Sequence, residues 1–186
     1  MIRHGEFDKA LAVLEFGCGT GRLAEILLEN HLPVTAWYIG VDMSETMVSL
    51  ASARLARFGN RAEVHLTDGS LKLNFEDGLF DRFVSCYVLD LLAIGDIQEL
   101  LREAKRVLSP GGLLCLVSLT HGFTPISGAV ERVWLKIFRT RPKLVGGCRP
   151  ISLVEFVSRR SWSVRFHNRY SSYGVPSEVL IAQKLI

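Results

Sequence analysis

The sequence predicts an α/β fold in which a doubly wound, mostly parallel sheet of seven strands lies between two layers of helices. Three observations support this prediction. Apolar runs of strand length alternate with amphipathic segments of helical period along the chain. Several of the runs are apolar nearly throughout, which is typical of strands that are covered on both faces. The last two runs follow each other without a helix between them, so we expect an antiparallel edge strand.

The first half of the chain supplies three strands and two helices. Residues 11–16 form the first strand, and residues 22–30 form a helix. A second strand covers residues 34–41, and Ser44 is placed to cap the next helix. Residues 62–66 form a short third strand. The apolar side chains of the second helix share one face: Met47, Val48, Ala51, Leu55 and Phe58.

The middle of the chain continues the alternation. The fourth strand covers residues 80–86, and the fifth covers residues 113–119 after a Ser-Pro-Gly-Gly turn at residues 109–112. Between these strands, Asp96 and Glu99 resemble a capping box and predict the start of a helix. These units complete the parallel part of the sheet.

The pattern loosens after the fifth strand. Residues 126–139 form a predicted helix, and residues 140–150 form a basic loop that contains glycine and proline. Ser152 and Glu155 make a second capping-box pair. No repeat or linker divides the chain, so it is predicted to form one domain over its whole length, 1–186. Two closing strands are expected to pair with each other, at residues 162–166 and 178–185.

The composition argues against several classes of protein. Hydrophobic residues make up 48% of the chain and charged residues 22%, as in ordinary globular proteins. A net charge of +3 does not indicate a nucleic-acid partner, which requires basic residues gathered on one surface. The four cysteines form no CxxC pair, which argues against a metal site and suits the reducing cytoplasm. We see no signal-peptide core and no apolar run of membrane-spanning length.

Residues that can bind a ligand follow the first three strands. The segment from Glu15 to Gly21 reads Glu-Phe-Gly-Cys-Gly-Thr-Gly, and its glycines let the backbone turn sharply and approach a ligand. Asp42 ends the second strand, where a carboxylate can accept two hydrogen bonds from a ribose diol. Asp68 and Gly69 follow the third strand. Because ligands bind beyond the carboxyl ends of parallel strands, these residues predict a nucleoside site.

The charge at Glu15 discriminates between nucleoside ligands. The run from Gly19 to Ala24 fits G-x-G-x-x-A, so NAD or FAD is one alternative. A carboxylate beside the turn would repel a pyrophosphate, whereas it would attract a cationic amino or sulfonium group. The residues therefore favour S-adenosylmethionine as the cofactor, with S-adenosylhomocysteine as its product.

These motifs resemble those of the class I S-adenosylmethionine-dependent methyltransferases. The segment from Glu15 to Gly21 matches the family's E/D-x-G-x-G-x-G motif, and residues 41–44 match its second-strand acid. Residues 80–84 and 107–112 are similar to its fourth strand and to the turn before its fifth. The resemblance covers residues 11–119 and is closest to small-molecule methyltransferases of the ubiquinone and menaquinone type. It implies a Rossmann-like fold and an enzyme that methylates a small-molecule acceptor, with lipid-like and quinone-like compounds among the candidates.

The resemblance also implies a role for each residue of the cofactor site. Glu15 would orient the methionine amino group, Asp42 would bind the ribose hydroxyls, and Met43 would pack on the adenine face. The glycine turn would let the backbone approach the methionine moiety. The loop after the third strand would bind the adenine edge, and the end of the fourth strand would lie near the transferred methyl group. These three segments comprise Gly17, Cys18, Gly19 and Gly21, then Asp68, Gly69 and Ser70, then Cys86 and Tyr87.

Two residues are candidates for a catalytic base. Asp90 lies among apolar residues after the fourth strand, where it can take a proton from the acceptor or cap a helix. His121 follows the fifth strand at the ligand end of the sheet, where a base and an ordinary loop histidine both fit. No metal-ligand spacing and no Ser-His-Asp order stands out.

Residues 121–150 are predicted to be an insert of helix and basic loop that covers the acceptor site. About ten residues precede the first strand, too few for the helical lid usual in the family, so helix 126–139 or the second subunit of a homodimer would replace it. Between positions 130 and 143, five basic residues oppose one acid. This basic side faces water, or it contacts a membrane surface or an anionic acceptor.

Two alternatives from other classes remain open. The chain could be a nicotinamide-dependent oxidoreductase, or a non-catalytic methyltransferase-like subunit that activates a partner. Methylation of a nucleic-acid base is disfavoured, because residues 85–88 read Ser-Cys-Tyr-Val where enzymes acting on amino nitrogens carry N/D-P-P-Y/F.

Overall fold

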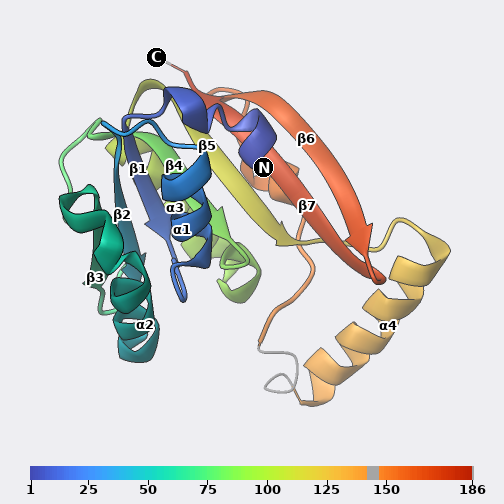
Figure 1. Ribbon diagram of the computed structural model, residues 1–186. Coiled ribbons are helices and arrows are strands. Elements are labelled where there is room, and N and C mark those ends of the chain that lie inside the picture. Colours follow the sequence, from blue (N-terminus) through green and yellow to red (C-terminus); the bar gives the residue numbers. More distant parts are fainter. Residues whose placement is uncertain (142–146, 186) are drawn as a thin grey trace.

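The computed structural model describes residues 1–141 and 147–185 and contains a twisted sheet with helices on both faces (Figure 1). The strand order is β3-β2-β1-β4-β5-β7-β6. The first five strands pair in parallel, whereas β7 runs antiparallel to β5 and to the edge strand β6. The predicted doubly wound, mostly parallel sheet is thereby confirmed. The strands are β1 (Ala12–Phe16), β2 (Trp37–Asp42), β3 (Ala62–Leu66), β4 (Phe80–Cys86), β5 (Leu108–Leu119), β6 (Trp162–Ser172) and β7 (Val175–Lys184).

Two apolar cores lie on opposite faces of the sheet. Successive side chains of a strand point to opposite faces, so Val13 packs in the core beside α1 whereas Leu14 packs in the core beside α3. All five residues of β1 are buried, as expected for a central parallel strand. The helices are α1 (Arg22–Asn30), α2 (Glu45–Leu55), α3 (Ile94–Val107), α4 (Pro125–Thr140) and α5 (Leu153–Phe156), with 3-10 turns at Ile2–His4, Phe7–Lys9, Ala56–Arg61 and Leu89–Leu91.

The capping predictions have mixed outcomes. Ser44 caps α2 as predicted, because its hydroxyl accepts a hydrogen bond from the Met47 N–H. The prediction for α3 was wrong, since the helix begins at Ile94 after Ala93, without a side-chain cap. The first helical hydrogen bond there runs from the Ile97 N–H to the Ala93 carbonyl, so Asp96 lies inside the first turn. α5 does follow Ser152, but no side chain caps it.

The predicted turn at residues 109–112 lies inside β5. Phe80 pairs with Leu108, and two residues later Arg82 pairs with Leu113, so the four residues between the two β5 positions bulge from the ladder. Gly111 has a φ of 78° in this bulge, a conformation that glycine adopts without strain. The Ser-Pro-Gly-Gly sequence therefore bends a strand instead of joining two elements.

The two closing strands form a hairpin that is longer than predicted. Tyr173 and Gly174 connect them, with φ values of 50° and 82°. A two-residue turn with positive φ at both positions matches the right-handed twist of antiparallel strands. The hairpin tip lies beside α4, because a Cβ on Gly174 would stand 2.9 Å from Val130 Cγ2.

The N-terminal segment packs on the sheet through a buried arginine. Arg82 of β4 is 7% exposed, and its guanidinium donates hydrogen bonds to the carbonyls of Gly5 and Glu6 at 2.7 and 2.6 Å. Phe7 is buried in the core on the α1 side. Residues 2–9 therefore cover the face of β4 beside α1 with two short 3-10 turns.

Candidate functional site

The glycine turn between β1 and α1 leaves part of its backbone open. Gly17, Gly19 and Gly21 have φ values of 75°, 52° and 71°. A Cβ on Gly17 would lie 2.4 Å from Val88 Cγ2, so packing alone requires that glycine. A Cβ on Gly19 would meet no atom within 4 Å. The backbone at Gly19 is therefore where a ligand can approach closely.

Asp42 ties this turn to the end of β2. Its Oδ2 accepts a hydrogen bond from the Gly19 N–H and its Oδ1 accepts one from the Ser44 N–H, both at 2.9 Å. The parallel pairing of Phe16 with Val41 brings the two strand ends together. A carboxylate offers about four acceptor positions, so Asp42 retains capacity for the two hydroxyls of a ribose.

Glu15 is a buried carboxyl directly beneath the turn. It is 3% exposed, and its Oε2 accepts a hydrogen bond of 2.6 Å from the Tyr38 hydroxyl. Burial raises the pKa of Glu15 from its usual 4.5 to about 8, and the negative charge of Asp42 adds to this rise. A cation beside Glu15 would restore its charged form.

Sequence reasoning missed Tyr38, which donates a hydrogen bond to Glu15, and Gly40, which leaves room for that contact. A Cβ on Gly40 would lie 2.8 Å from the Tyr38 hydroxyl and 2.9 Å from Cys18 Cβ, so this glycine leaves room for both. Gly40 pairs with Glu15 across the β1–β2 ladder. A glycine inside a strand indicates that another group approaches the backbone closely, so Gly40 was the one sequence signal that could have predicted this contact. Burial also raises the pKa of Cys18 to about 12, which keeps its thiol protonated.

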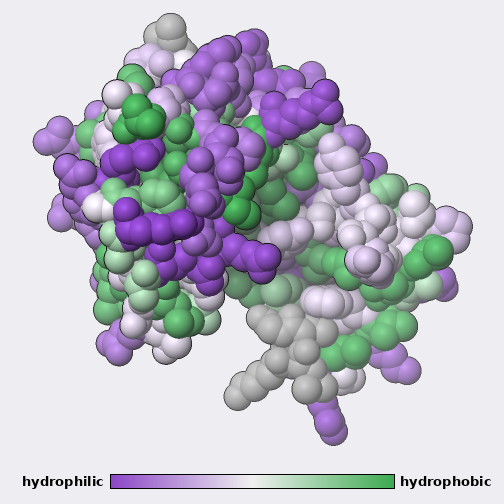
Figure 2. Space-filling model, viewed as in Figure 1, coloured by the Kyte–Doolittle hydropathy of each residue, from purple (hydrophilic) through white to green (hydrophobic). Residues whose placement is uncertain are grey.

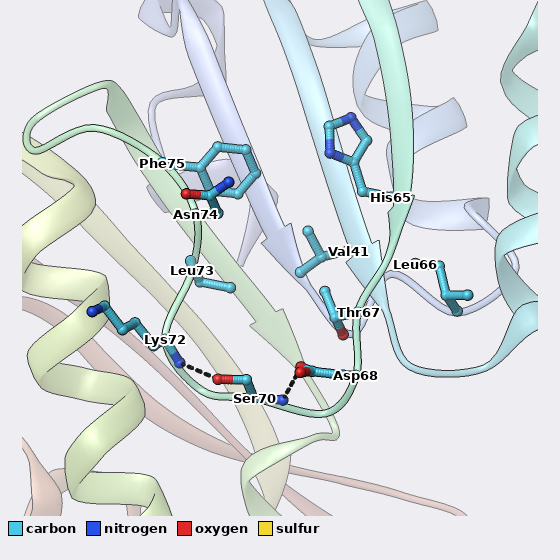
Figure 3. Close-up of a pocket in the computed structure, with 10 residues that line it drawn as sticks. All are labelled: Val41, His65, Leu66, Thr67, Asp68, Ser70, Lys72, Leu73, Asn74 and Phe75. Carbon is cyan, nitrogen blue, oxygen red and sulfur yellow. Dashed lines mark hydrogen bonds between the residues drawn. The ribbon is translucent and has the colours of Figure 1, made fainter.

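The loop after β3 brings two predicted residues face to face. Met43 is 71% exposed, and its Cε lies 3.6 Å from the position of a Cβ on Gly69. Asp68 is exposed, and its Oδ1 accepts a hydrogen bond of 2.8 Å from the Ser70 N–H. Asp68 and Ser70 are among ten residues that line an open cavity of about 630 Å³, most of them from the segment after β3 (Figure 3).

The two predicted residues at the end of β4, Cys86 and Tyr87, contact different neighbours. Cys86 Sγ lies 3.7 Å from Met1 Sδ, and burial raises the pKa of this thiol. Tyr87 has a φ of 57°, which is uncommon for a residue with a side chain. Its hydroxyl lies 3.0 Å from Ser177 Oγ at the start of β7. Such backbone strain concentrates at functional sites.

The two candidate bases have separate partners. Asp90 is 1% exposed, its Oδ2 accepts a hydrogen bond of 3.3 Å from the Leu119 N–H, and its Oδ1 has no partner among the described residues. Burial raises the pKa of Asp90. His121 is exposed, and its Nδ1 lies 2.6 Å from Glu131 Oε1. The structure therefore links Asp90 to the end of β5 and His121 to α4.

A further buried acid, which sequence reasoning missed, organises the region beside the candidate site. Glu178 of β7 is 1% exposed. Its oxygens accept hydrogen bonds from the Thr120 hydroxyl and the Leu153 N–H, both at 3.0 Å, and His167 Nε2 lies 2.7 Å away. The acid thereby joins the end of β5, the start of α5 and β6. No local sequence pattern predicts a contact between residues that are so far apart in the chain.

Comparison with known proteins places the chain in a family. A family described as "Methyltransferase domain" matches residues 13–112. The demethylmenaquinone methyltransferase of Lactococcus lactis is 34% identical over 136 residues, which are 73% of this chain and 52% of that protein. The 2-phytyl-1,4-naphtoquinone methyltransferase of Synechococcus elongatus is 30% identical over 66% of this chain and 52% of that protein. The chain spans about half the length of these curated relatives.

The fold agrees with this assignment. The crystal structure of a SAM-dependent methyltransferase from Methanosarcina mazei superposes with a TM-score of 0.78 at 19% identity, covering 100% of this chain and 97% of that one. The chain is a member of the methyltransferase domain family. More particularly, its motifs and fold are those of the class I S-adenosylmethionine-dependent methyltransferases, as predicted. Membership in this family argues against the alternative that the chain is a nicotinamide-dependent oxidoreductase.

The site residues fit S-adenosylmethionine, the cofactor of this family. The open backbone at Gly19 offers the close approach that the methionine moiety needs. Asp42 has unused acceptor positions for the ribose, and the exposed Met43 side chain offers an apolar surface beside Gly69 for the adenine face. No group of three His, Cys, Asp or Glu side chains that could hold a metal ion occurs within residues 1–141 and 147–185.

Proposed function

We propose that this chain transfers a methyl group from S-adenosylmethionine to a small, largely apolar acceptor, of which a quinone-like ring with a lipid tail is the best-supported class. The main observation is the convergence of Glu15, Gly19 and Asp42 at the adjoining ends of β1 and β2. Two relatives whose names specify quinone-type acceptors support the acceptor class.

The donor half of the site explains binding and orientation. S-adenosylmethionine, when bound, supplies an electrophilic methyl group on a positively charged sulfur. Glu15 would lose its proton and pair with the amino group of the methionine moiety, since a nearby cation favours the carboxylate. Asp42 would accept hydrogen bonds from the ribose, and Met43 would pack on the adenine face. Asp68 and the Ser70 N–H would form hydrogen bonds with the adenine edge.

The acceptor would lie between the end of β4 and α4, which belongs to the insert predicted at residues 121–150. Residues 142–146 of that insert lie outside the described residues. Cys86 and Tyr87 would border the position of the transferred methyl group. α4 begins just beyond β5, at the end of the sheet where the parallel strands terminate (Figure 1). Apolar side chains under α4, among them Leu119, Val130 and Trp134, would contact an apolar acceptor there, but the recess they line is only about 10 Å³, so α4 would have to move to admit it.

Asp90 is the better of the two candidates for a base. Carbon methylation requires a proton to leave the acceptor, and a base with a raised pKa can take it near neutral pH. Asp90 has a raised pKa and a carboxyl oxygen that lacks a partner among the described residues. His121 is exposed and already lies beside Glu131.

The proposal is tested with a soluble demethylmenaquinone analogue and S-adenosylmethionine, with S-adenosylhomocysteine formation as the readout. Asp42→Ala should weaken S-adenosylhomocysteine binding by at least about tenfold, because it removes charge-assisted hydrogen bonds. Asp90→Asn should lower turnover without changing that affinity. Asp8→Asn, at an exposed position in the N-terminal segment, is the control. Absence of S-adenosylhomocysteine binding in the unmodified protein would overturn the proposal and favour a non-catalytic partner subunit.

A further inference from the structure

α4 is an amphipathic helix whose apolar side is only partly covered. Ser127 is the one residue of this helix that is buried. Ile126 is 70% exposed and Val133 is 61% exposed. The helix is attached to the body by a hydrogen bond of 3.0 Å from Trp134 Nε1 to the Cys148 carbonyl and by its contact with the hairpin tip at Gly174. An apolar stripe therefore remains at the surface.

Aromatic side chains extend this stripe onto the β6–β7 hairpin. Tyr173 at the hairpin tip is fully exposed, Tyr170 is 47% exposed and Phe123 is 43% exposed. The Arg169 guanidinium lies over the Phe123 ring, 5.5 Å from its centroid. Figure 2 shows hydrophobic surface over α4, at the lower right of the view. Aromatic rings with polar edges or neighbours suit the interface between lipid and water.

The same region has a positive net charge, whereas the rest of the chain is nearly neutral. Residues 121–141 and 167–177 contain five basic residues and one acid, a net charge of +4, so the rest of the chain carries −1 within its total of +3. The single acid, Glu131, is engaged by the His121 ring and by the Gly122 N–H. The basic residues are Arg132, Lys136, Arg139, Arg141 and Arg169.

We propose that this surface docks on a lipid bilayer that contains anionic headgroups. The docking face consists of Phe123, Ile126, Arg132, Val133, Lys136, Arg139, Tyr170 and Tyr173. On a helical projection, Arg132, Lys136 and Arg139 lie on one flank of the stripe formed by Ile126 and Val133. An apolar stripe with basic residues along its margin is the pattern of helices that lie in a membrane interface. The charge complements anionic lipid, and the stripe requires an apolar phase that free phosphate or nucleic acid lacks.

The position of the docking face gives it a functional consequence. α4 and the hairpin tip lie at the end of the sheet where β1, β4 and β5 terminate (Figure 1). Docking would therefore turn that end of the sheet toward the bilayer. None of the described helices has the length and apolarity to cross a membrane, so the contact would be peripheral. A lipid-soluble acceptor would then reach the site from the membrane, a consequence that rests on the proposed function.

The docking proposal is tested by co-sedimentation with vesicles of phosphatidylcholine, with and without phosphatidylglycerol. The unmodified protein should bind the mixed vesicles and release as salt is raised, because exposed charges are screened. Each basic residue near an anionic surface changes affinity about fivefold, so Arg132→Gln combined with Lys136→Gln should weaken binding by at least about tenfold. Ile126→Ser combined with Val133→Ser should weaken binding to a similar extent.

The controls separate docking from folding and from the proposed function. Arg159→Gln combined with Arg160→Gln makes the same change of charge at exposed positions outside the docking face and should leave vesicle binding unchanged. Every variant should retain its melting temperature and its affinity for S-adenosylhomocysteine. Failure to bind either vesicle, or equal binding by all variants, would overturn the docking proposal whatever the cofactor result. A dimer that Ile126→Ser with Val133→Ser dissociates would instead assign the face to a second copy of the chain.

Discussion

Replacing Glu15 by glutamine should stabilise the free protein while weakening its affinity for the cofactor. Glutamine keeps the size of the side chain and an oxygen that can accept the 2.6 Å hydrogen bond from Tyr38. It removes the ionisation of a carboxyl that is only 3% exposed. The substitution therefore separates the electrostatic cost of this acid from its packing.

The magnitude follows from the pKa. Burial raises the pKa of Glu15 from 4.5 to about 8, so between pH 4.5 and pH 7 the folded state holds a proton that the unfolded state loses. That interval costs the folded protein about 3 kcal/mol at 1.36 kcal/mol per pH unit. Glutamine removes this cost, but its buried amide N–H has no assigned partner, which destabilises the variant by roughly 1–3 kcal/mol. We expect a net gain of about 1 kcal/mol at pH 7.

The pH dependence is the sharper readout, because the amide penalty does not vary with pH. A raised folded-state pKa contributes stability that is fully present below pH 4.5 and is lost as the pH rises toward 8. Urea titrations between about pH 5 and pH 8 should show the advantage of Glu15→Gln over the unmodified protein growing by about 1 kcal/mol per pH unit. Glu76→Gln, at an exposed acid, is the control and should show no such trend.

Cofactor binding should respond in the opposite sense. Pairing with the amino group requires ionised Glu15, so the affinity of the unmodified protein for S-adenosylhomocysteine should rise up to about tenfold from pH 6 to pH 7. Isothermal titration of Glu15→Gln should show weaker binding without this rise. A stability difference that is constant with pH, or a variant that binds as tightly as the unmodified protein, would refute the reasoning.

Four further substitutions test the site and the fold. Gly17→Ala should destabilise the protein by about 2–4 kcal/mol in urea titrations, because its Cβ would lie 2.4 Å from Val88, whereas Gly19→Ala should cost only about 1 kcal/mol and mainly weaken S-adenosylhomocysteine binding. Equal losses of stability would contradict the different surroundings of the two glycines. Arg82→Met should cost about 3 kcal/mol, since it leaves the buried Gly5 carbonyl and the partly buried Glu6 carbonyl without their donors. A neutral result in thermal unfolding would show that the N-terminal segment packs independently. Tyr38→Phe should raise the pKa of the buried carboxyl beneath the turn and weaken cofactor binding at pH 7 several-fold, and unchanged binding would show that this hydroxyl does not support the charged form.

Local patterns in the sequence determined most of the fold and pointed to the residues that we propose for the donor site. The predicted bounds of α1, β3 and β4 are those of the structure, because helical period and apolar runs arise from neighbours in the chain. The glycine turn and Asp42 were predicted for a similar reason. Their roles depend on the end of a strand and the turn that follows it, and both are visible in a short segment.

Tertiary structure alone decided how these segments support one another. Tyr38 reaches Glu15 only because β1 and β2 lie side by side with Glu15 opposite Gly40, so a residue 23 positions away controls the charge of the buried acid. Glu178 likewise joins three elements that no local pattern connects. The start of α3 was mispredicted because the helix begins with a backbone hydrogen bond from Ile97 to Ala93 that needs no capping side chain. Contacts between distant segments depend on strand register and burial, which the period of a short segment does not specify.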